Sequence, residues 1–297
     1  MLLLTWYTRL QPRLPYIAAI LAACALPAAE QLAPEPKPDS GQSVTAAFEG
    51  WYKKPDGTFN LLIGYYNRNL KQELDIPIGP NNRIEDPGSA AAGDPDRGQP
   101  THFLTGRQWG MFTINVPKDF GDKKLTWTLT ANGATTAIPV SLNPLYEISP
   151  FIDATGNTPP SVGFAMTGPF AQGPRSVTIT MTATVSEPLP LKVWVGDDAK
   201  KVPGASAALT RFAPASVIWS KFRGPGNVTF SNGRTPAEKA DFPPPNGSTF
   251  TGTQTTTATF SAPGEYILRV GGNDWSGEGG GGFQCCWTSA YVKVTVK

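Results

Sequence analysis

The sequence predicts an all-β protein: two antiparallel β-sandwiches in tandem, preceded by an export signal and a flexible tether. Three observations support this. Short runs in which apolar residues alternate with threonine recur along the chain, the pattern of half-buried strands. The 31 glycines and 30 prolines among 297 residues fall largely between these runs, where they mark turns. Outside the N-terminus, no long stretch rich in alanine, leucine, glutamate and lysine predicts a helix.

Residues 1–29 predict an export signal. Arg9 and Arg13 precede the apolar run Tyr16–Leu26, which is too short to span a bilayer as a helix. A buried structural helix is the alternative interpretation.

Two ways of processing this signal remain open. Residues 21–24 (LAAC) resemble a bacterial lipobox, after which Cys24 would be the lipidated first residue. Small residues at Ala23 and Ala25, or at Ala28 and Ala29, would instead suit ordinary signal peptidase. Residues 30–42 follow as a charged, proline-rich tether without apolar periodicity.

The charge balance excludes nucleic acid as a partner. The chain has 25 basic and 23 acidic residues; Arg9 and Arg13 belong to the leader, and no acid precedes Glu30, so the remainder carries 23 of each sign. Nucleic acids and anionic membranes bind basic surfaces, which such a chain does not predict. We expect membrane association only through an N-terminal lipid anchor.

Residues 43–148 are expected to form the first sandwich. The turn signal Pro55-Asp56-Gly57 lies between two strand-like runs and predicts a hairpin. The strand after this turn carries apolar residues on one face. In the strand before it, Trp51-Tyr52 should place one ring inward and one outward. Residues 80–100 are expected to be a long polar loop. The predicted strands are Ser43–Lys54, Thr58–Asn67, Glu73–Ile78, Arg107–Val116, Leu125–Thr130 and Ala134–Leu142.

Residues 149–160 are expected to be a short, fairly stiff linker, and residues 161–297 the second sandwich. Residues 232–252 are expected to be a polar, proline-rich insertion. The final stretch should contribute two closing strands around a glycine-rich loop. The predicted strands are Val177–Val185, Leu189–Val195, Ser216–Phe222, Asn227–Ser231, Thr257–Val270 and Ala290–Lys297.

The second segment resembles the PKD-type immunoglobulin-like repeat of cell-surface proteins. The matching stretches are Ile218–Lys221 (IWSK), Gly224–Phe230 (GPGNVTF), Thr257–Val270 (TATFSAPGEYILRV), Asn273-Asp274 and Val292–Val296 (VKVTV). The resemblance covers residues from about 160 to 297 and implies an immunoglobulin-like sandwich. The resemblance gives little information about function, because such repeats serve as spacers, adhesion modules and binding modules. The first segment is assigned as immunoglobulin-like by its strand number alone.

The segment after Asn273-Asp274 departs from this pattern, since it contains a glycine-rich loop and Cys285-Cys286. Four interpretations of these cysteines remain open: a vicinal disulfide, buried reduced thiols, pairing with Cys24 or another chain, and a metal site. The last lacks the CxxC spacing typical of metal ligands.

The glycine-rich loop is flanked by Trp275 and Trp287 and contains Glu278. A flexible hairpin loop is the simple interpretation. The alternative is a binding site in which these three residues contact a ligand and the tryptophans stack on sugar rings. His102 is the sole histidine, and without a GxSxG or HExxH motif it predicts no catalytic residue.

Several acidic residues are candidates for calcium binding, although turn or capping roles explain them as well. Asp94–Gly98 resembles a fragment of a calcium loop that lacks the third acid and the terminal glutamate. Asp153 lies in the predicted linker. Four more candidates lie where strands of the second segment end: Asp197, Asp198, Asn273 and Asp274.

The sequence therefore favours a non-catalytic bacterial envelope protein with a structural, adhesive or protein-binding role, located in the periplasm, at the outer membrane or outside the cell. The expected partner is an envelope protein or polysaccharide. The alternative function is glycan binding around residues 275–287, and catalysis is the least favoured. No cofactor is expected other than calcium.

Overall fold

The computed structural model describes residues 37–86, 94–201, 213–277 and 285–297. The predicted signal peptide, Cys24 and Glu278 lie outside these residues. Strands dominate the described chain, as the sequence predicts. None of its helices is long and apolar enough to cross a membrane.

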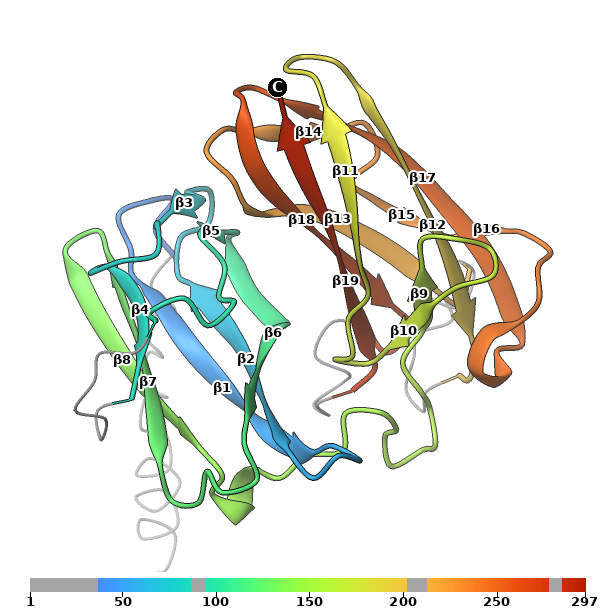
Figure 1. Cartoon of the computed structure of the whole chain (residues 1–297). Helices are drawn as coiled ribbons and strands as arrows, with labels where there is room; N and C mark the ends of the chain where they lie inside the picture. The colour runs from blue at the N-terminus through green and yellow to red at the C-terminus, as the bar shows by residue number, and fades with distance from the viewer. Residues whose placement is uncertain (1–36, 87–93, 202–212, 278–284) are drawn as a thin grey trace, which may run out of the picture. The chain divides into compact units, whose positions relative to one another are not determined.

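The N-terminal sandwich consists of two three-stranded sheets, ordered β1-β2-β6 and β4-β7-β8, with a small β3-β5 ladder beside them (Figure 1). Its elements are β1 (Val44–Lys53), β2 (Phe59–Asn67), β3 (Leu74–Asp75), β4 (Asn82–Glu85), β5 (His102–Phe103), β6 (Gly106–Val116), β7 (Lys124–Ala131), β8 (Ala134–Ser141) and the short helix η1 (Pro144–Tyr146). In the lettering used for immunoglobulin-like folds, β1, β2 and β6 correspond to strands A, B and E, and β4, β7 and β8 correspond to C, F and G. The arrangement is immunoglobulin-like without strand D.

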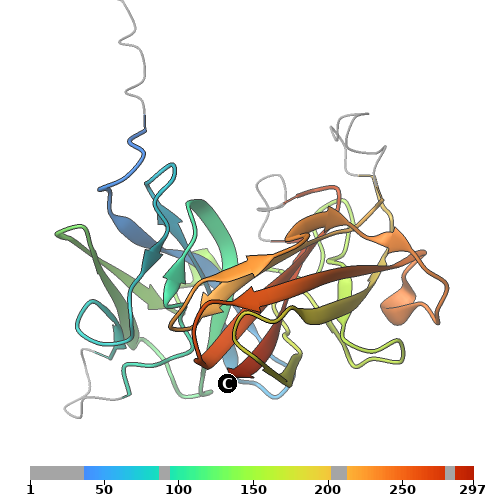
Figure 2. The same cartoon turned by 90° about the horizontal axis from the view of Figure 1, so that it is seen from above.

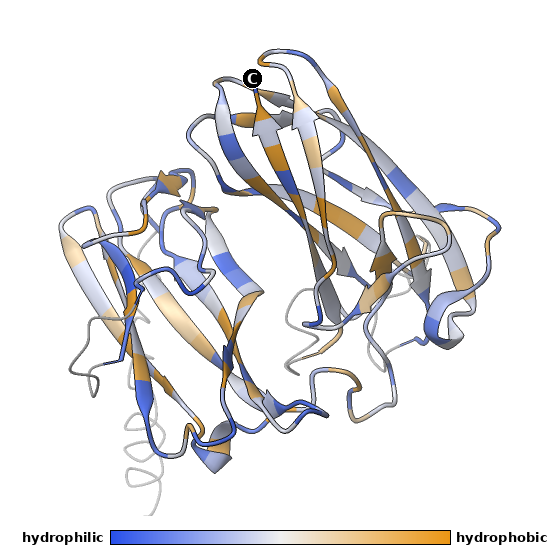
Figure 3. Ribbon diagram, in the orientation of Figure 1, coloured by the Kyte–Doolittle hydropathy of each residue, from blue (hydrophilic) through white to orange (hydrophobic). Residues whose placement is uncertain are grey.

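Alternation along these strands builds the core between the two sheets. Leu125, Trp127 and Leu129 of β7 point inward and are buried, and they meet Leu61 and Ile63 of β2. Orange bands, which mark hydrophobic residues, recur along the strands in Figure 3. The sequence predicts this hairpin and its inward row correctly because turn and alternation agree.

Two expectations for this half are wrong. The expected polar loop 80–100 contains β4, whose Asn82 and Ile84 are buried; four residues are too few for a visible alternation. Both rings of Trp51 and Tyr52 are buried. The outward Tyr52 packs against Phe151, with ring centroids 5.2 Å apart, because the chain leaving this sandwich runs back along β1.

The C-terminal sandwich contains two sheets, ordered β10-β9-β12-β17-β14, with β16 also paired to β17, and β11-β19-β18-β13-β15. Figure 2 shows it turned by 90°. Its elements are β9 (Ser161–Gly163), β10 (Phe170–Gln172), β11 (Thr178–Ala183), β12 (Leu189–Asp197), β13 (Ser216–Arg223), β14 (Val228–Phe230), β15 (Arg234–Pro236), β16 (Glu238–Lys239), the short helix η3 (Pro245–Gly247), β17 (Phe250–Phe260), β18 (Gly264–Asn273) and β19 (Trp287–Val296).

Strand order identifies this sandwich as immunoglobulin-like. One sheet reads A-B-E-D (β9-β12-β17-β16) and the other A′-G-F-C-C′ (β11-β19-β18-β13-β15), in which β11 pairs with β19 in parallel. Two further features of such folds are present. Trp219 is buried on the C strand, β13. Tyr266, near the start of β18, donates its hydroxyl to the Ala262 carbonyl at 2.8 Å, which is a tyrosine corner. The narrower PKD-type assignment stays a prediction.

The boundaries of several strands differ from expectation. Residues 257–270 do not form one strand: β17 ends at Phe260 and β18 begins at Gly264, in the other sheet. Pro263-Gly264 is the turn between them, and Gly264 has a φ of +138°. The expected insertion 232–252 contains β15 and β16. The strands β9 and β10 precede the first strand that alternation predicts.

The two sandwiches are joined by buried side chains. Phe222 of β13 is 3% exposed and belongs to the core of the N-terminal sandwich. The hydroxyl of Tyr291 donates to the Met111 carbonyl at 2.6 Å. Arg223 forms a two-pronged ion pair with Asp96, both distances being 2.8 Å. Residues Pro38–Lys297 form one compact unit, and the division into two domains stays a prediction.

Candidate functional site

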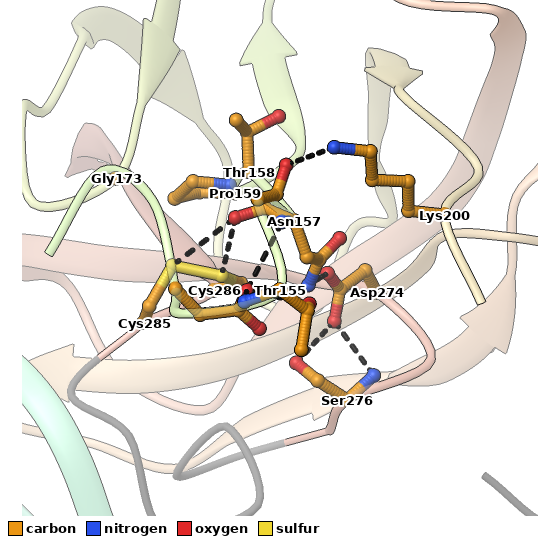
Figure 4. Close-up of a disulfide and its surroundings, with 12 residues drawn as sticks. Thr155, Asn157, Thr158, Pro159, Gly173, Lys200, Asp274, Ser276, Cys285 and Cys286 are labelled. Atoms are coloured by element: carbon orange, nitrogen blue, oxygen red, sulfur yellow. Dashed lines mark hydrogen bonds between the residues drawn. A yellow bond between two sulfur atoms is a disulfide. The ribbon is translucent and has the colours of Figure 1, made fainter. Parts of the chain in front are cut away.

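An aspartate cluster lies at one end of the C-terminal sandwich, where the ends of two strands meet the predicted linker. We define it as Asp153, Asn157, Asp197, Asp198 and Asp274. Asp197 ends β12 and Asp274 follows the last residue of β18, whereas Asp153 and Asn157 precede β9. Figure 4 shows Asn157 and Asp274 beside the sulfur atoms of Cys285 and Cys286.

Hydrogen bonds fix the linker to both strand ends. The Asn157 side-chain amide donates to Asp274 Oδ2 at 2.6 Å. One residue on, the backbone N–H and the hydroxyl of Thr158 donate to Asp198 Oδ2 at 3.0 and 2.9 Å. Asp274 Oδ1 accepts from Ser276 N at 2.8 Å and from the Ser276 hydroxyl. The linker is therefore part of the folded end of the sandwich, which its polar and proline-rich sequence does not predict.

Several oxygens of the cluster are buried without a partner. Asn157 is 0% exposed and Asp197 is 2% exposed, yet Asn157 Oδ1 and Asp197 Oδ2 meet no hydrogen-bond donor of the described chain. The same holds for Asp153 Oδ2. The other oxygen of Asp197 accepts from Ala199 N at 2.8 Å. Buried polar atoms are normally paired, so these orphaned oxygens are exceptions within the fold.

Burial dominates the electrostatics of the two strand-end carboxylates. Burial, assisted by the negative charge of Asp274, raises the pKa of Asp197 to about 8. Burial likewise raises the pKa of Asp274, against the lowering effect of its bonds to Ser276 and Asn157. None of the ion pairs among the described residues includes a member of the cluster.

Cys285 and Cys286 are joined to each other by a disulfide, the first of the four interpretations considered. Both are buried, and their sulfur atoms lie 4.0 and 3.4 Å from the Asn157 carbonyl oxygen. Disulfide sulfurs carry no proton, so these are packing contacts. The disulfide thereby covers the backbone of the residue whose side chain reaches Asp274 (Figure 4).

The tryptophans predicted to bind a ligand have different environments. Trp287 is 5% exposed and contacts Trp109, with ring centroids 6.5 Å apart, so its ring is not available for stacking on a ligand. Trp275 is partly exposed and lines a cavity of about 390 Å³ together with Arg234 and Asn273. Glu278 is outside the described residues.

His102 is held between two carboxylates. Its Nδ1 lies 2.9 Å from Asp75 and its Nε2 lies 3.0 Å from Glu73. Asp75 also pairs with Lys221 of the C-terminal sandwich at 2.9 Å. Both ring nitrogens are therefore engaged, in a chain of contacts that joins the two sandwiches. Asp96, from the fragment that resembles a calcium loop, pairs instead with Arg223.

A buried carboxyl group at the junction escapes sequence analysis. Glu49 is 5% exposed; it accepts from Arg107 at 2.8 Å and from the Gly110 backbone at 2.8 Å. Arg269 of the C-terminal sandwich also approaches β6, and its guanidinium donates to the Trp109 carbonyl at 3.5 Å. Its positive charge acts on Glu49 as well. These partners are far apart in the sequence, and no motif connects them.

Comparisons with known proteins identify no family: no family model and no curated protein matches the chain. Among solved structures, the chain is similar to the D00-D0 domain of intimin, with 12% identity, 85% of this chain and 100% of that chain covered, and a TM-score of 0.25. For domains 4 and 5 of the S-layer protein SbsC the values are 13%, 86%, 98% and 0.23. TM-scores this low do not indicate a common arrangement of the whole chain.

Proposed function

We propose that the chain is a non-catalytic, exported protein of the bacterial envelope, in which two immunoglobulin-like sandwiches act together in a structural or adhesive role. The observation that carries the proposal is the junction. Phe222 enters the opposite core and Arg223 clamps Asp96, so the sandwiches are coupled by buried contacts. A surface module that holds position or transmits load needs such coupling, whereas modules on a free linker move independently.

Export supports the same role. The apolar run after Arg13 ends at a candidate lipobox, and the disulfide between Cys285 and Cys286 is the state expected in an oxidising compartment. Mass spectrometry of the N-terminus of the native protein tests the anchor. A diacylglyceryl-modified Cys24 makes the chain a lipoprotein, and an unmodified terminus after Ala25 or Ala29 makes it a protein released by ordinary signal peptidase.

The adhesive role is tested by displaying the chain on a bacterium that lacks it and measuring adherence to surfaces coated with envelope proteins or polysaccharides. We expect a gain over cells that display an unrelated immunoglobulin-like domain at equal density. Exposure at the cell surface is measured separately, as cleavage of the chain by protease added to intact cells. The proposal is contradicted if the displaying cells show no gain in adherence and the chain is not cleaved.

Glycan binding is the second candidate, and the cavity beside Trp275 favours it. A partly exposed indole next to Arg234 and Asn273 combines a stacking face with hydrogen-bonding groups. Polysaccharide titrations followed by tryptophan fluorescence test it. Quenching that Trp275→Ala abolishes supports this function, and an unchanged response in that variant rejects it. Trp194, on the B strand away from this cavity, offers the matched control Trp194→Ala.

A further inference from the structure

A cavity of about 330 Å³ lies at the junction, with walls from both sandwiches. One wall belongs to β6, and the other to the sheet that contains β11, β19 and β18. Side chains held on strands have well-fixed positions, which favours a preformed binding site. The strand residues that line the cavity and matter below are Phe112, Thr113, Thr178, Ile267, Tyr291 and Lys293.

The floor of the cavity is the outer face of the C-terminal sheet. Along β19, Val292 is buried in the core of that sandwich, so its neighbours Tyr291 and Lys293 project from the opposite face. In the parallel ladder, Thr178 of β11 lies opposite Tyr291. In the antiparallel ladder, Ile267 of β18 lies opposite Lys293. A ring, an ammonium group, a hydroxyl and an apolar side chain are therefore neighbours on one surface.

The charge of the cavity wall is positive. Arg223 and Lys293 are the charged members among the described residues that line it, and these include no Asp or Glu. Arg223 is neutralised by its two-pronged ion pair with Asp96. Lys293 is exposed and belongs to none of the ion pairs of the described chain. One ammonium group is therefore left to balance a negative charge from outside the chain.

A buried guanidinium adds to this positive charge. Arg269 is 8% exposed, and its Nε donates at 3.1 Å to the hydroxyl of Ser289, which lines the cavity. Arg269 also takes part in no ion pair among the described residues. Burial raises the pKa of Tyr291, and the positive charges of Arg269 and Arg223 oppose that rise. The tyrosine hydroxyl thus lies in a positive field, which attracts an anionic ligand.

Two acids of the surrounding structure do not cancel this field at the cavity. Glu49 is paired with Arg107 at 2.8 Å. Glu265, on the outer face of β18, accepts from the Thr295 hydroxyl at 3.0 Å. Neither of these glutamates lines the cavity.

The lining chemistry selects the class of ligand. Phe112, Ile267 and the ring of Tyr291 offer apolar contact. The hydroxyls of Thr113 and Thr178 can each donate and accept a hydrogen bond. A sugar ring combines an apolar C–H face with hydroxyl groups, and a uronic acid adds the single negative charge that one ammonium group balances. The volume is near the lower end of the range for ligand pockets, roughly 300–1,000 Å³, which suits a short segment of a glycan.

We propose that this cavity binds a carboxylate-bearing sugar of an acidic polysaccharide, with Lys293 paired to the carboxylate and Tyr291 packed against the sugar ring. The inference rests on the adhesive function proposed above and names the class of surface that the chain recognises. The site is separate from the cavity beside Trp275, whose lining shares no residue with this one.

The test is calorimetric titration of the purified full chain with trigalacturonate and with its methyl ester, which keeps the rings and removes the charges. We expect saturable binding of the acid, with an affinity about tenfold higher than that of the ester, because a hydrogen bond to a charged group is the stronger kind. Added NaCl should weaken the binding of the acid and leave that of the ester unchanged, because an exposed ion pair is screened by salt. No saturable binding of the acid, or equal affinities for acid and ester, would overturn the inference.

Variants locate the site. Lys293→Met keeps the length of an exposed side chain and removes its charge, so it should fold and should bind the acid about tenfold more weakly. Lys123→Met, at an exposed lysine of the N-terminal sandwich, is the matched control and should bind like the wild type. Trp275→Ala should also leave this binding unchanged. Equal losses in the two lysine variants, or a loss in Trp275→Ala alone, would place the binding elsewhere and overturn the inference.

Two further outcomes separate the inference from the proposed function. Adherence of displaying cells without binding of trigalacturonate by the purified chain would overturn the inference and leave the adhesive function standing. Binding of trigalacturonate that depends on Lys293, without adherence of the cells, would support the site and count against that function. An acidic peptide that binds more tightly than trigalacturonate and competes with it would overturn the assignment to a sugar.

Discussion

Glu49 is a carboxyl group enclosed at the junction, with Arg107 and the Gly110 backbone as its donors. Burial outweighs these donors and raises its pKa from 4.5 to about 7. Between these two pH values the folded chain holds a proton that the unfolded chain releases. The stability contributed by this group is therefore complete below about pH 4.5 and is lost as the pH rises through about 7.

We predict that Glu49→Gln removes this part of the pH dependence. The free energy of unfolding from urea titrations should fall with rising pH more steeply in the wild type than in the variant, by on the order of 3 kcal/mol across the window, since one pKa unit corresponds to about 1.4 kcal/mol. Other titrating groups cancel in the difference. Parallel pH profiles for the two proteins would refute the prediction.

Individual residues show where sequence reasoning stops. The pairing of Cys285 with Cys286 was among the interpretations that adjacency left open, because the choice depends on the local backbone. The environment of Trp287 could not be foreseen, since its ring is buried by Trp109, a residue of the other sandwich. Glu49 carries no signal, as its donors lie 58 and 61 residues away.

The strand β6 is interrupted by a bulge at Gly110, where its register with β2 shifts. Gly110 has a φ of +49°, and a Cβ added there would lie 2.1 Å from the Trp287 indole nitrogen. The missing side chain allows the indole from β19 to approach the backbone of β6. This glycine therefore has both a conformational and a steric reason to be present.

Gly110→Ala should destabilise the chain by more than backbone strain alone. Gly133→Ala is the matched control, because Gly133 also has a positive φ, +79°, but no atom within 4 Å of an added Cβ. We expect the control to lose about 1–2 kcal/mol from left-handed strain and Gly110→Ala to lose a further 1–3 kcal/mol, roughly, from overpacking. Chemical denaturation measures both; equal losses would show that the close approach has no cost.

Element prediction succeeded where alternation and turn chemistry agreed and failed where a strand was short. The hairpin of β7 and β8 has eight residues in each strand, enough for the period of two to be visible. The two- to four-residue strands β4, β9 and β16 are defined by their partners across the sheet, which a local pattern does not contain. The sequence prediction joins β17 and β18 into one strand across the turn at Pro263-Gly264, although this dipeptide is itself a turn signal.

Coupling between the sandwiches depends on Phe222, which lies in the N-terminal core and contacts Tyr291 with ring centroids 5.3 Å apart. We predict that the wild type unfolds in a single calorimetric transition and that Phe222→Ala separates it into two. Truncation of a buried phenylalanine costs about 3–5 kcal/mol of stability. At Phe222 we expect most of this loss to weaken the contacts between the two sandwiches.

Phe260→Ala is the matched control, since Phe260 is 0% exposed but lies within the C-terminal core. It should lower the unfolding temperature without dividing the transition. Two transitions in the wild type would show that the sandwiches unfold independently. The same result would favour the two-domain division that the sequence predicts.

The parallel pairing of β11 with β19 has a mechanical consequence. The ladder runs from Thr178 opposite Tyr291 to Ala183 opposite Val296. Tension that pulls the chain before β11 and the chain after β19 in opposite directions slides the two strands along each other. Their hydrogen bonds are then loaded in shear and must rupture together, whereas a hairpin peeled from one end opens bond by bond. Because its bonds to β11 must rupture together, β19 should resist tension in this direction more strongly than a hairpin strand would.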